Sequence, residues 1–258
     1  MKRPKILILR AAGTNCDWET ANAFEAVGGQ AERLHINALK TGKAKLMNYD
    51  MLVLPGGFSY GDDVGAGRIM ANQVRAHLKD LRQFIRLGRP VLGICNGFQV
   101  LVKSGILPLS NTCEQTAGFT FNDSGKFEAR WVHLRINSQS SCLFFKGLAE
   151  MVELPVAHGE GKLVLKSPRQ LEELKKNKSI AMQYVSDDGK LSGYPHNPNG
   201  SIFNIAALSN PEGNVLGLMP HPERFTAIHQ HPNWTRQTFH KESIGLEMFR
   251  NAVKYCQS

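Results

Sequence analysis

The sequence predicts an α/β domain with a mostly parallel central sheet and helices on both of its faces. Short apolar runs typical of buried strands alternate with longer amphipathic stretches through the first half of the chain. Glycine-rich loops follow several of these runs, and parallel sheets place their functional sites at such loops. The second half holds more strand-like runs, so we expect an additional small β-rich portion there.

The first half contains four expected strands and three expected helices. The strands are at residues 6–9, 31–36, 51–54 and 91–94, and the helices are at 17–27, at 69–87 and directly after Cys95. Each strand is a short apolar run, which is typical of burial on both faces. Because parallel strands share a carboxyl edge, we expect the loops that hold Thr14, Gly57 and Cys95 to converge there.

The second half contains six expected strands and two expected helices. The strands are at residues 127–136, 151–155, 162–165, 180–185, 202–208 and 215–219, and the helices are at 167–174 and 243–255. Apolar and polar residues alternate over 130–136, which indicates an exposed or edge strand. The sequence DDG at 187–189 predicts a hairpin turn.

Composition narrows the classes of partner. The 258 residues carry a net charge of +9, but the basic residues are spread out and lack the interleaved aromatic residues of nucleic-acid-binding motifs. We therefore expect that the chain does not bind nucleic acid. An acidic partner or phosphorylated ligands would better explain the basic surface. No apolar run approaches the ~20 residues of a membrane span, so we expect no membrane association.

Cysteine usage indicates a reducing compartment. The five cysteines, which are odd in number and show no C-x-x-C spacing, are Cys16, Cys95, Cys113, Cys142 and Cys256. This pattern favours neither a disulfide framework nor a zinc site, and it fits the cytoplasm. The first apolar run leads directly into a loop, which favours a strand over a signal peptide.

Cys95 lies at the end of an expected strand and before an expected helix, in the sequence GICNG at residues 93–97. This is the cysteine form of the G-x-S-x-G nucleophile elbow, where glycines allow a strand to turn sharply into a helix. The start of the helix would favour a thiolate and any oxyanion formed beside it. The alternative is a buried structural cysteine between two packing glycines.

A thiol nucleophile needs a base, and the base needs an acceptor that orients it. His221 and Glu223 follow another expected strand, and two prolines stiffen the segment that holds them. Their spacing puts both side chains on one side of an extended chain, so Glu223 can hold one imidazole nitrogen and leave the other for Cys95. Without the elbow, the same sequence would more often be a plain surface turn.

Other motifs leave more than one interpretation open. The loop at 56–62 is a tight turn, a phosphate cradle or an oxyanion hole; no Gly-Lys-Ser/Thr follows it, which disfavours the cradle. In an oxyanion hole, the N–H groups of Gly57 and Asn96 would each lower the barrier by about 3 kcal/mol. His158 could bind a ligand or be structural. His229 and His231 lack a third ligand with suitable spacing, so we expect no metal site.

The sequences GICNGFQ at 93–99 and MPHPER at 219–224 together resemble the class I, triad-type glutamine amidotransferases. Motifs at 13–17, 55–62, 157–162 and 197–201 are similar to those of the PurQ family, the glutaminase subunits of phosphoribosylformylglycinamidine synthase. The resemblance runs from Ile6 to about Arg224. It implies a flavodoxin-like fold in a single domain spanning residues 1–258, with insertion-like segments at 166–194 and 226–241.

The resemblance also implies a reaction and its participants. Cys95 would attack the side-chain amide of L-glutamine to give a γ-glutamyl thioester and ammonia. His221 would act as base and then as acid, Glu223 would orient it, and Gln99 would help to hold the substrate. A PurL-like synthetase would bind ATP and magnesium and use the ammonia to convert formylglycinamide ribonucleotide into the amidine in purine synthesis. A small PurS-like subunit would complete the complex, and no cofactor is expected in this chain.

The sequence departs from the family pattern at residues 61–67, which read GDDVGAG where the family often has GDYLRAG. This difference bears on how a partner docks. Two alternatives remain: a related triad hydrolase such as a γ-glutamyl peptidase, which would not need the motifs at 13–17 and 197–201, and a non-catalytic scaffold, which would normally lack a triad residue. Because a free thiolate would waste glutamine, we expect contact with the partner to complete the site.

Overall fold

The computed structural model describes residues 2–108, 114–236 and 242–258, so Cys113 and the end of the segment 226–241 lie outside the described residues. Nine strands form the central sheet in the order β2-β1-β3-β4-β11-β10-β9-β6-β7. They are β1 Lys5–Arg10, β2 Gln30–His35, β3 Met51–Leu54, β4 Val91–Ile94, β6 Glu128–Ile136, β7 Met151–His158, β9 Ile180–Val185, β10 Ile205–Ser209 and β11 Val215–Leu218. Strands β5 (Ala117–Thr120) and β8 (Lys162–Leu165) lie outside this sheet and pair with each other. They form a small additional β-rich portion.

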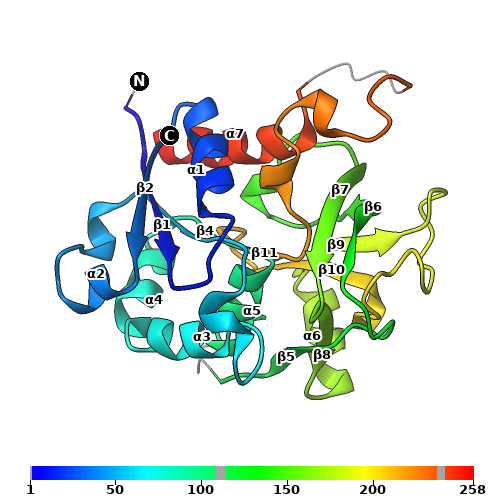
Figure 1. Cartoon of the computed structure of the whole chain (residues 1–258), viewed down its shortest axis with the longest axis horizontal. Helices are drawn as coiled ribbons and strands as arrows, with labels where there is room; N and C mark the ends of the chain where they lie inside the picture. The colour runs from blue at the N-terminus through cyan, green and yellow to red at the C-terminus, as the bar shows by residue number, and fades with distance from the viewer. Residues whose placement is uncertain (1, 109–113, 237–241) are drawn as a thin grey trace.

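The sheet has two halves that meet at β11. Strands β2, β1, β3, β4 and β11 are parallel neighbours, whereas β10, β9, β6 and β7 pair antiparallel. The helices are α1 Asp17–Ala26, α2 Asn37–Lys40, α3 Arg68–Arg75, α4 Leu78–Arg86, α5 Asn96–Lys103, α6 Pro168–Lys176 and α7 Ile244–Gln257. Helices α1 and α7 lie on one side of the parallel half, and α3, α4 and α5 lie on the other (Figure 1). The predicted α/β architecture is confirmed.

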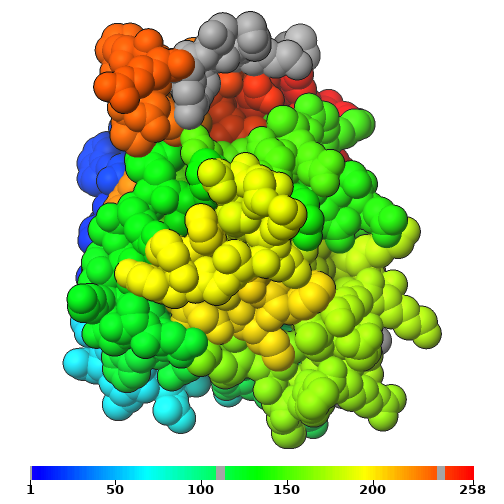
Figure 2. All heavy atoms as spheres, turned by 90° about the vertical axis from the view of Figure 1, so that its right-hand side faces the viewer, coloured from blue at the N-terminus to red at the C-terminus, as the bar shows by residue number. Residues whose placement is uncertain are grey.

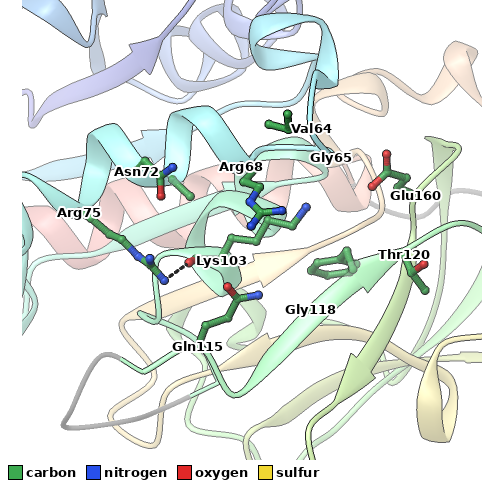
Figure 3. Close-up of a pocket in the computed structure, with 12 residues that line it drawn as sticks. Val64, Gly65, Arg68, Asn72, Arg75, Lys103, Gln115, Gly118, Thr120 and Glu160 are labelled. Atoms are coloured by element: carbon green, nitrogen blue, oxygen red, sulfur yellow. Dashed lines mark hydrogen bonds between the residues drawn. The ribbon is translucent and has the colours of Figure 1, made fainter.

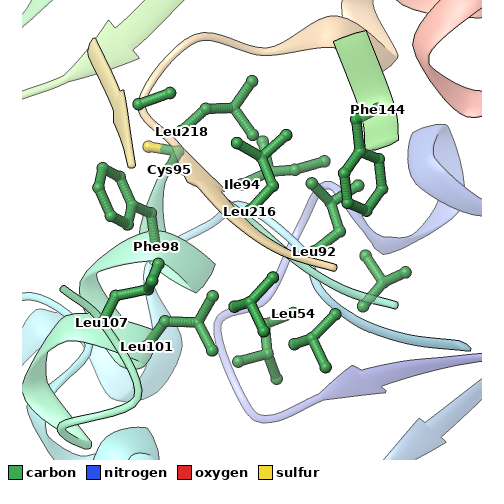
Figure 4. Close-up of a cluster of buried hydrophobic side chains, with 14 of the residues drawn as sticks. Leu54, Leu92, Ile94, Cys95, Phe98, Leu101, Leu107, Phe144, Leu216 and Leu218 are labelled. Carbon is green, nitrogen blue, oxygen red and sulfur yellow. The ribbon is translucent and has the colours of Figure 1, made fainter. Parts of the chain in front are cut away.

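The apolar runs that were expected to be buried strands form the core of the protein. Every residue of β3, β4 and β11 is buried, because helices cover both faces of the parallel half. Leu54, Leu92 and Leu216 pack in one apolar cluster with Cys95 at its margin (Figure 4). Full burial of each such leucine stabilises the fold by about 1.5–3 kcal/mol relative to exposure. The nucleophile candidate therefore lies at the end of a fully buried strand.

One local prediction was wrong, and two were correct only in part. The expected helix at 69–87 is two helices, because His77 leaves the helical conformation (φ −110°, ψ 15°) between α3 and α4. Strand β6 is not at an edge: it lies between β9 and β7, and its alternation reflects one partly exposed face. The turn at 187–189 forms, but within the described chain no strand returns from it to pair with β9, whose two sides are already occupied by β10 and β6.

The segment 166–194 contributes α6 and β9, and β9 is an inner strand of the sheet. The residues that follow β9, drawn in yellow, lie at the centre of the face that the antiparallel half presents in Figure 2. No helix in the described parts of the chain has both the length and the apolar character needed to cross a membrane.

Candidate active site

Cys95 lies at the junction of β4 and α5, in a strained backbone conformation. Its φ of 48° and ψ of −103° are rare for a residue with a side chain, and such strain is held only where the surroundings fix it. The Cys95 N–H donates to the Leu218 carbonyl at 2.7 Å. A Cβ at Gly97 would lie 1.8 Å from the Leu54 carbonyl oxygen, so only glycine allows α5 to start this close to β3. The sharp turn predicted from the two glycines is present.

His221 and Glu223 follow β11, the parallel neighbour of β4. Leu218 pairs with Ile94 in the sheet, so the two chains leave it side by side. The His221 N–H donates to the Pro155 carbonyl at 2.8 Å, which fixes the turn against β7. Imidazole Nδ1 lies 2.6 Å from Glu223 Oε1, and both residues are buried. The predicted contact between the two side chains forms, but Glu223 lies in a short 3-10 turn at Pro222–Arg224 and not in the extended chain that the spacing argument assumed.

The surroundings of His221 favour its charged form. Burial alone would lower its pKa, but the Glu223 carboxylate and the side chains of Cys95 and Cys16 raise the pKa well above the ordinary value. The second ring nitrogen, Nε2, is buried and makes no hydrogen bond to any described residue. A histidine that can hold a proton next to a thiol is the arrangement that converts the thiol into a thiolate.

Cys16 is a second thiol beside the imidazole, and the sequence analysis assigned it no role. Its sulfur accepts a hydrogen bond from Arg224 Nη2 at 3.2 Å, and the same guanidinium binds Glu19 Oε2 through Nε at 3.1 Å. Helix α1 is thereby tied to the turn that carries His221. Burial is the main reason that the pKa of Cys16 is raised. Its position in the loop after β1, at the same sheet edge, is the signal that could have found it.

The loops expected to converge do so. Thr14 and Gly57 form an isolated antiparallel bridge, and the Cys16 N–H donates to the Gly56 carbonyl at 3.2 Å. A Cβ at Gly56 would lie 2.9 Å from His221 Cε1, so a glycine is required between the loop and the imidazole. Within the described chain, neither the Gly57 N–H nor the Asn96 N–H donates a backbone hydrogen bond. The two amides are therefore compatible with the oxyanion hole that the sequence predicts.

The side chains of Asn96 and Gln99 form a buried network next to the elbow. Asn96 Nδ2 donates to Gln99 Oε1 at 3.0 Å, and Asn96 Oδ1 accepts from the Ser59 N–H at 3.3 Å. Gln99 Nε2 donates to the Glu160 carbonyl at 2.7 Å. The network links α5 to the loop after β3 and to the turn after β7, the three segments around Cys95.

The other candidate histidines have separate surroundings. His158 is buried between two amides: Nδ1 lies 3.2 Å from Asn122 Oδ1 and Nε2 lies 3.4 Å from Asn199 Nδ2. Burial lowers its pKa to about 3, which is the signature of a neutral structural histidine. His231 Nε2 lies 2.7 Å from Glu153 Oε2, on the outer side of β7.

One group of described residues has the donor types and spacing of a metal site. Ligand atoms of Cys16, His221 and Glu223 lie within 4.8 Å of one another, and all three residues are buried. The His221–Glu223 hydrogen bond and the Arg224 guanidinium on the Cys16 sulfur already use these atoms. A cation would also have to enter beside that guanidinium, so a thiol–imidazole–carboxylate site fits the group better than a metal site.

Comparison with known proteins agrees with this geometry. The model of the CobB/CobQ-like glutamine amidotransferase domain matches residues 3–256. The phosphoribosylformylglycinamidine synthase subunit PurQ of Dehalococcoides mccartyi is 46% identical over 100% of this chain and 99% of its own length. The protein of the same name from Archaeoglobus fulgidus is 44% identical over 98% of this chain and 97% of its own.

A solved structure gives the same fold. A chain of the structure described as PurLQS from Thermotoga maritima superposes with a TM-score of 0.74 at 27% identity, over 98% of this chain and 99% of that one. The glutaminase domain of Trypanosoma brucei CTPS, solved with bound acivicin, has a TM-score of 0.59 at 14% identity, over 98% of this chain and 94% of that one, and shares the fold.

Proposed function

Because the chain belongs to the PurQ family of glutamine amidotransferases, we propose that it is the glutaminase subunit of a phosphoribosylformylglycinamidine synthase. It hydrolyses L-glutamine to glutamate and delivers the ammonia to a PurL-like synthetase, with a small PurS-like subunit in the complex. The synthetase binds ATP and magnesium and converts formylglycinamide ribonucleotide into the amidine. The unpaired cysteine pattern supports a cytoplasmic location.

Each triad residue has a defined chemical task in this proposal. The Cys95 thiolate attacks the side-chain carbonyl carbon of glutamine, and the N–H groups of Gly57 and Asn96 stabilise the oxyanion. His221 gives its proton to the departing ammonia, which leaves a γ-glutamyl thioester on Cys95. His221 then takes a proton from water as the water attacks the thioester, and glutamate is released. Glu223 keeps the imidazole oriented and stabilises its charge.

One observation carries the proposal: the elbow cysteine and the hydrogen-bonded His221–Glu223 pair lie at the ends of two adjacent parallel strands. The same geometry supports control by the partner. Cys95 is only 5% exposed, so a movement of the loops around it would widen the access of glutamine to the sulfur. We therefore propose that the isolated chain turns over glutamine slowly and that docking of the synthetase opens the site.

Cys95→Ala tests the assignment in the assembled complex. Glutamine-dependent amidine synthesis should disappear, whereas synthesis from added ammonium should continue, because the variant lacks only the ammonia source. Labelling with the electrophilic glutamine analogue diazo-oxo-norleucine should modify Cys95 stoichiometrically in the unsubstituted protein. Absence of labelling would favour a scaffold, and loss of both activities in the variant would argue for a structural Cys95.

A further inference from the structure

A basic cavity of about 420 Å³ lies between α3, the end of α5 and strand β5. It is separate from the triad, since neither Cys95 nor His221 lines it. Three cationic side chains, Arg68, Arg75 and Lys103, surround it, and Glu160 is the acidic residue in its lining. The elements that form it are close to the nucleophile, because α5 begins immediately after Cys95.

The spacing of the residues on α3 creates the cationic wall. Arg68, Asn72 and Arg75 are at positions i, i+4 and i+7, which share one face of a helix. Lys103 is the last residue of α5. In Figure 3 the side chains of Arg68, Lys103 and Gln115 extend toward one another across the cavity. The groups presented are guanidinium, ammonium and amide, which are hydrogen-bond donors.

The positive charge in the cavity is incompletely balanced. Arg75 Nη2 donates to the Lys103 carbonyl at 2.7 Å and Lys103 Nζ donates to the Ala66 carbonyl at 2.6 Å, so both bind neutral acceptors. Arg68 forms neither a hydrogen bond nor an ion pair within the described chain. Burial and the neighbouring Arg68 lower the pKa of Lys103, against the opposing effect of Glu160 and Asp62. Arg68 and Lys103 repel each other, and an anion between them would offset this repulsion.

The cavity's size and donor set select the class of anion. Small-molecule sites are about 300–1,000 Å³, so the cavity can hold a phosphorylated small molecule. Arginine binds phosphate through two parallel hydrogen bonds, and lysine adds a point charge. The Glu160 carboxylate and the Thr120 hydroxyl can accept hydrogen bonds from the hydroxyl groups of a sugar.

A short chain of hydrogen bonds connects the cavity to the elbow. The Ala66 carbonyl accepts from Lys103, and the Ala66 N–H donates to Glu160 Oε2 at 3.2 Å. The Glu160 carbonyl accepts from Gln99, whose side chain also binds Asn96 next to Cys95. Val64, a β-branched residue, has a φ of 57° in the loop that this chain holds. Such a conformation persists only where contacts impose it, and it is common at switch regions.

We propose that this cavity binds a phosphate monoester of ribonucleotide size between Arg68 and Lys103, and that the bound ligand stabilises the 64–67 loop and activates the glutaminase. The binding part stands on the cavity alone, and the activation part rests on the proposed function. Occupation holds Arg68 against the phosphate, while Lys103, which has three N–H donors, binds the phosphate and keeps its hydrogen bond to the Ala66 carbonyl. The loop and Glu160 then hold Gln99 and Asn96 in the arrangement that supports the elbow.

The binding part is tested by titration calorimetry on the full chain, with inorganic phosphate and AMP as probes at fixed ionic strength. One site is expected, with tighter binding of AMP because the cavity also contacts the sugar. Arg68→Gln should weaken binding about tenfold or more, the loss expected for hydrogen bonds to a charged group. Arg169→Gln removes a cation from exposed α6, outside the cavity lining, and should leave binding unchanged.

Three outcomes would overturn the binding part: no binding of either probe, equal losses in Arg68→Gln and Arg169→Gln, or intact phosphate binding in Arg68→Gln with lost association to the synthetase. The last result would assign the cavity to an acidic segment of the partner. Titration of Cys95→Ala separates this test from the proposed function, since binding there does not depend on turnover.

The activation part is tested by glutamine turnover in the complex, with and without AMP. Turnover should rise at least twofold in the unsubstituted protein and in Arg169→Gln, and it should not respond in Arg68→Gln. Binding of AMP without any change in turnover would refute the activation and leave a binding site only.

Discussion

Two turns of this molecule each bury a histidine, with opposite effects on its charge. In the turn at 220–224, His221 lies beside the Glu223 carboxylate and two thiols, and its pKa is raised well above the ordinary value. In the turn at 157–162, His158 lies between two neutral amides, and burial lowers its pKa to about 3. Burial opposes the charged form of both rings, so the neighbours decide the outcome.

The comparison shows why a histidine in a promising loop is weak ground for a functional assignment. His221 follows β11 and His158 is the last residue of β7, and both lie in motifs that the sequence analysis selected. Only His221 combines a charged partner with a second nitrogen that makes no hydrogen bond among the described residues. Both nitrogens of His158 face amide groups, which suits a ring that holds structure together.

Substitution of the two histidines should give the largest contrast. His221→Asn should reduce kcat for glutamine hydrolysis in the complex by about 10⁴-fold or more, since it removes the proton carrier. His158→Gln should change kcat by less than about tenfold and should instead lower the free energy of unfolding by about 1–3 kcal/mol, because buried hydrogen bonds are disturbed. Steady-state kinetics and urea unfolding measure both. Equal losses of activity would remove the distinction between the two turns.

Glu223→Gln should have the next largest effect, because it keeps the shape of the acceptor but removes the charge that raises the pKa of His221. We expect a loss of about 10³–10⁴-fold in kcat, similar to other triads that lose their carboxylate. The pKa of His221, followed by NMR of the labelled ring, should fall. A variant with an unchanged ring pKa would show that the carboxylate does not control it.

The dependence of stability on pH should differ in sign between the two rings. Unfolded His158 takes up a proton near pH 6.5, whereas the folded ring stays neutral until about pH 3. Its contribution to the free energy of unfolding therefore falls as the pH is lowered through this window, by up to about 1.4 kcal/mol per pH unit. His221 contributes fully below pH 6.5, and its contribution is lost as the pH rises through its raised folded pKa. Urea unfolding of His158→Gln between pH 7 and pH 4.5 should show a flatter profile than the unsubstituted protein; identical profiles would contradict the neutral assignment.

Cys16→Ser should have the smallest effect. The hydroxyl keeps a polar contact with Arg224 but is smaller than the thiol, so we expect a two- to tenfold fall in kcat/KM and about 1 kcal/mol of destabilisation. Because Cys16 acts through His221, the pH profile of kcat/KM should shift as well. Cys142→Ser, a matched change at a buried thiol beside Phe144 and Ser209, should destabilise the fold without moving that profile.

The residues that could be predicted are those whose local sequence determines their geometry. Cys95 sits on an elbow because glycines flank it, and His221 meets Glu223 because the short turn at Pro222–Arg224 brings the two side chains together. These predictions needed only a few neighbouring residues. Their catalytic roles remain proposals.

The features that were missed depend on contacts between distant segments. The break at His77 and the inner position of β6 follow from packing that the sequence does not display locally. Cys16 contacts Arg224 across more than two hundred residues of chain. Burial is the main cause of the lowered pKa of His158, and His221, from a distant segment, is the next. Such contacts become visible only when the chain is folded.

Strands β4 and β11 are hydrogen-bonded neighbours, and this pairing limits where the chain can gain or lose residues without disturbing the geometry of the site. The sulfur and the imidazole are aligned by a backbone ladder, so the long stretch of chain between them can gain or lose surface residues while their spacing stays constant. A single residue added inside either strand would turn alternate side chains to the opposite face. Length variation among descendants of this protein should therefore accumulate in the loops and stop at these two strands.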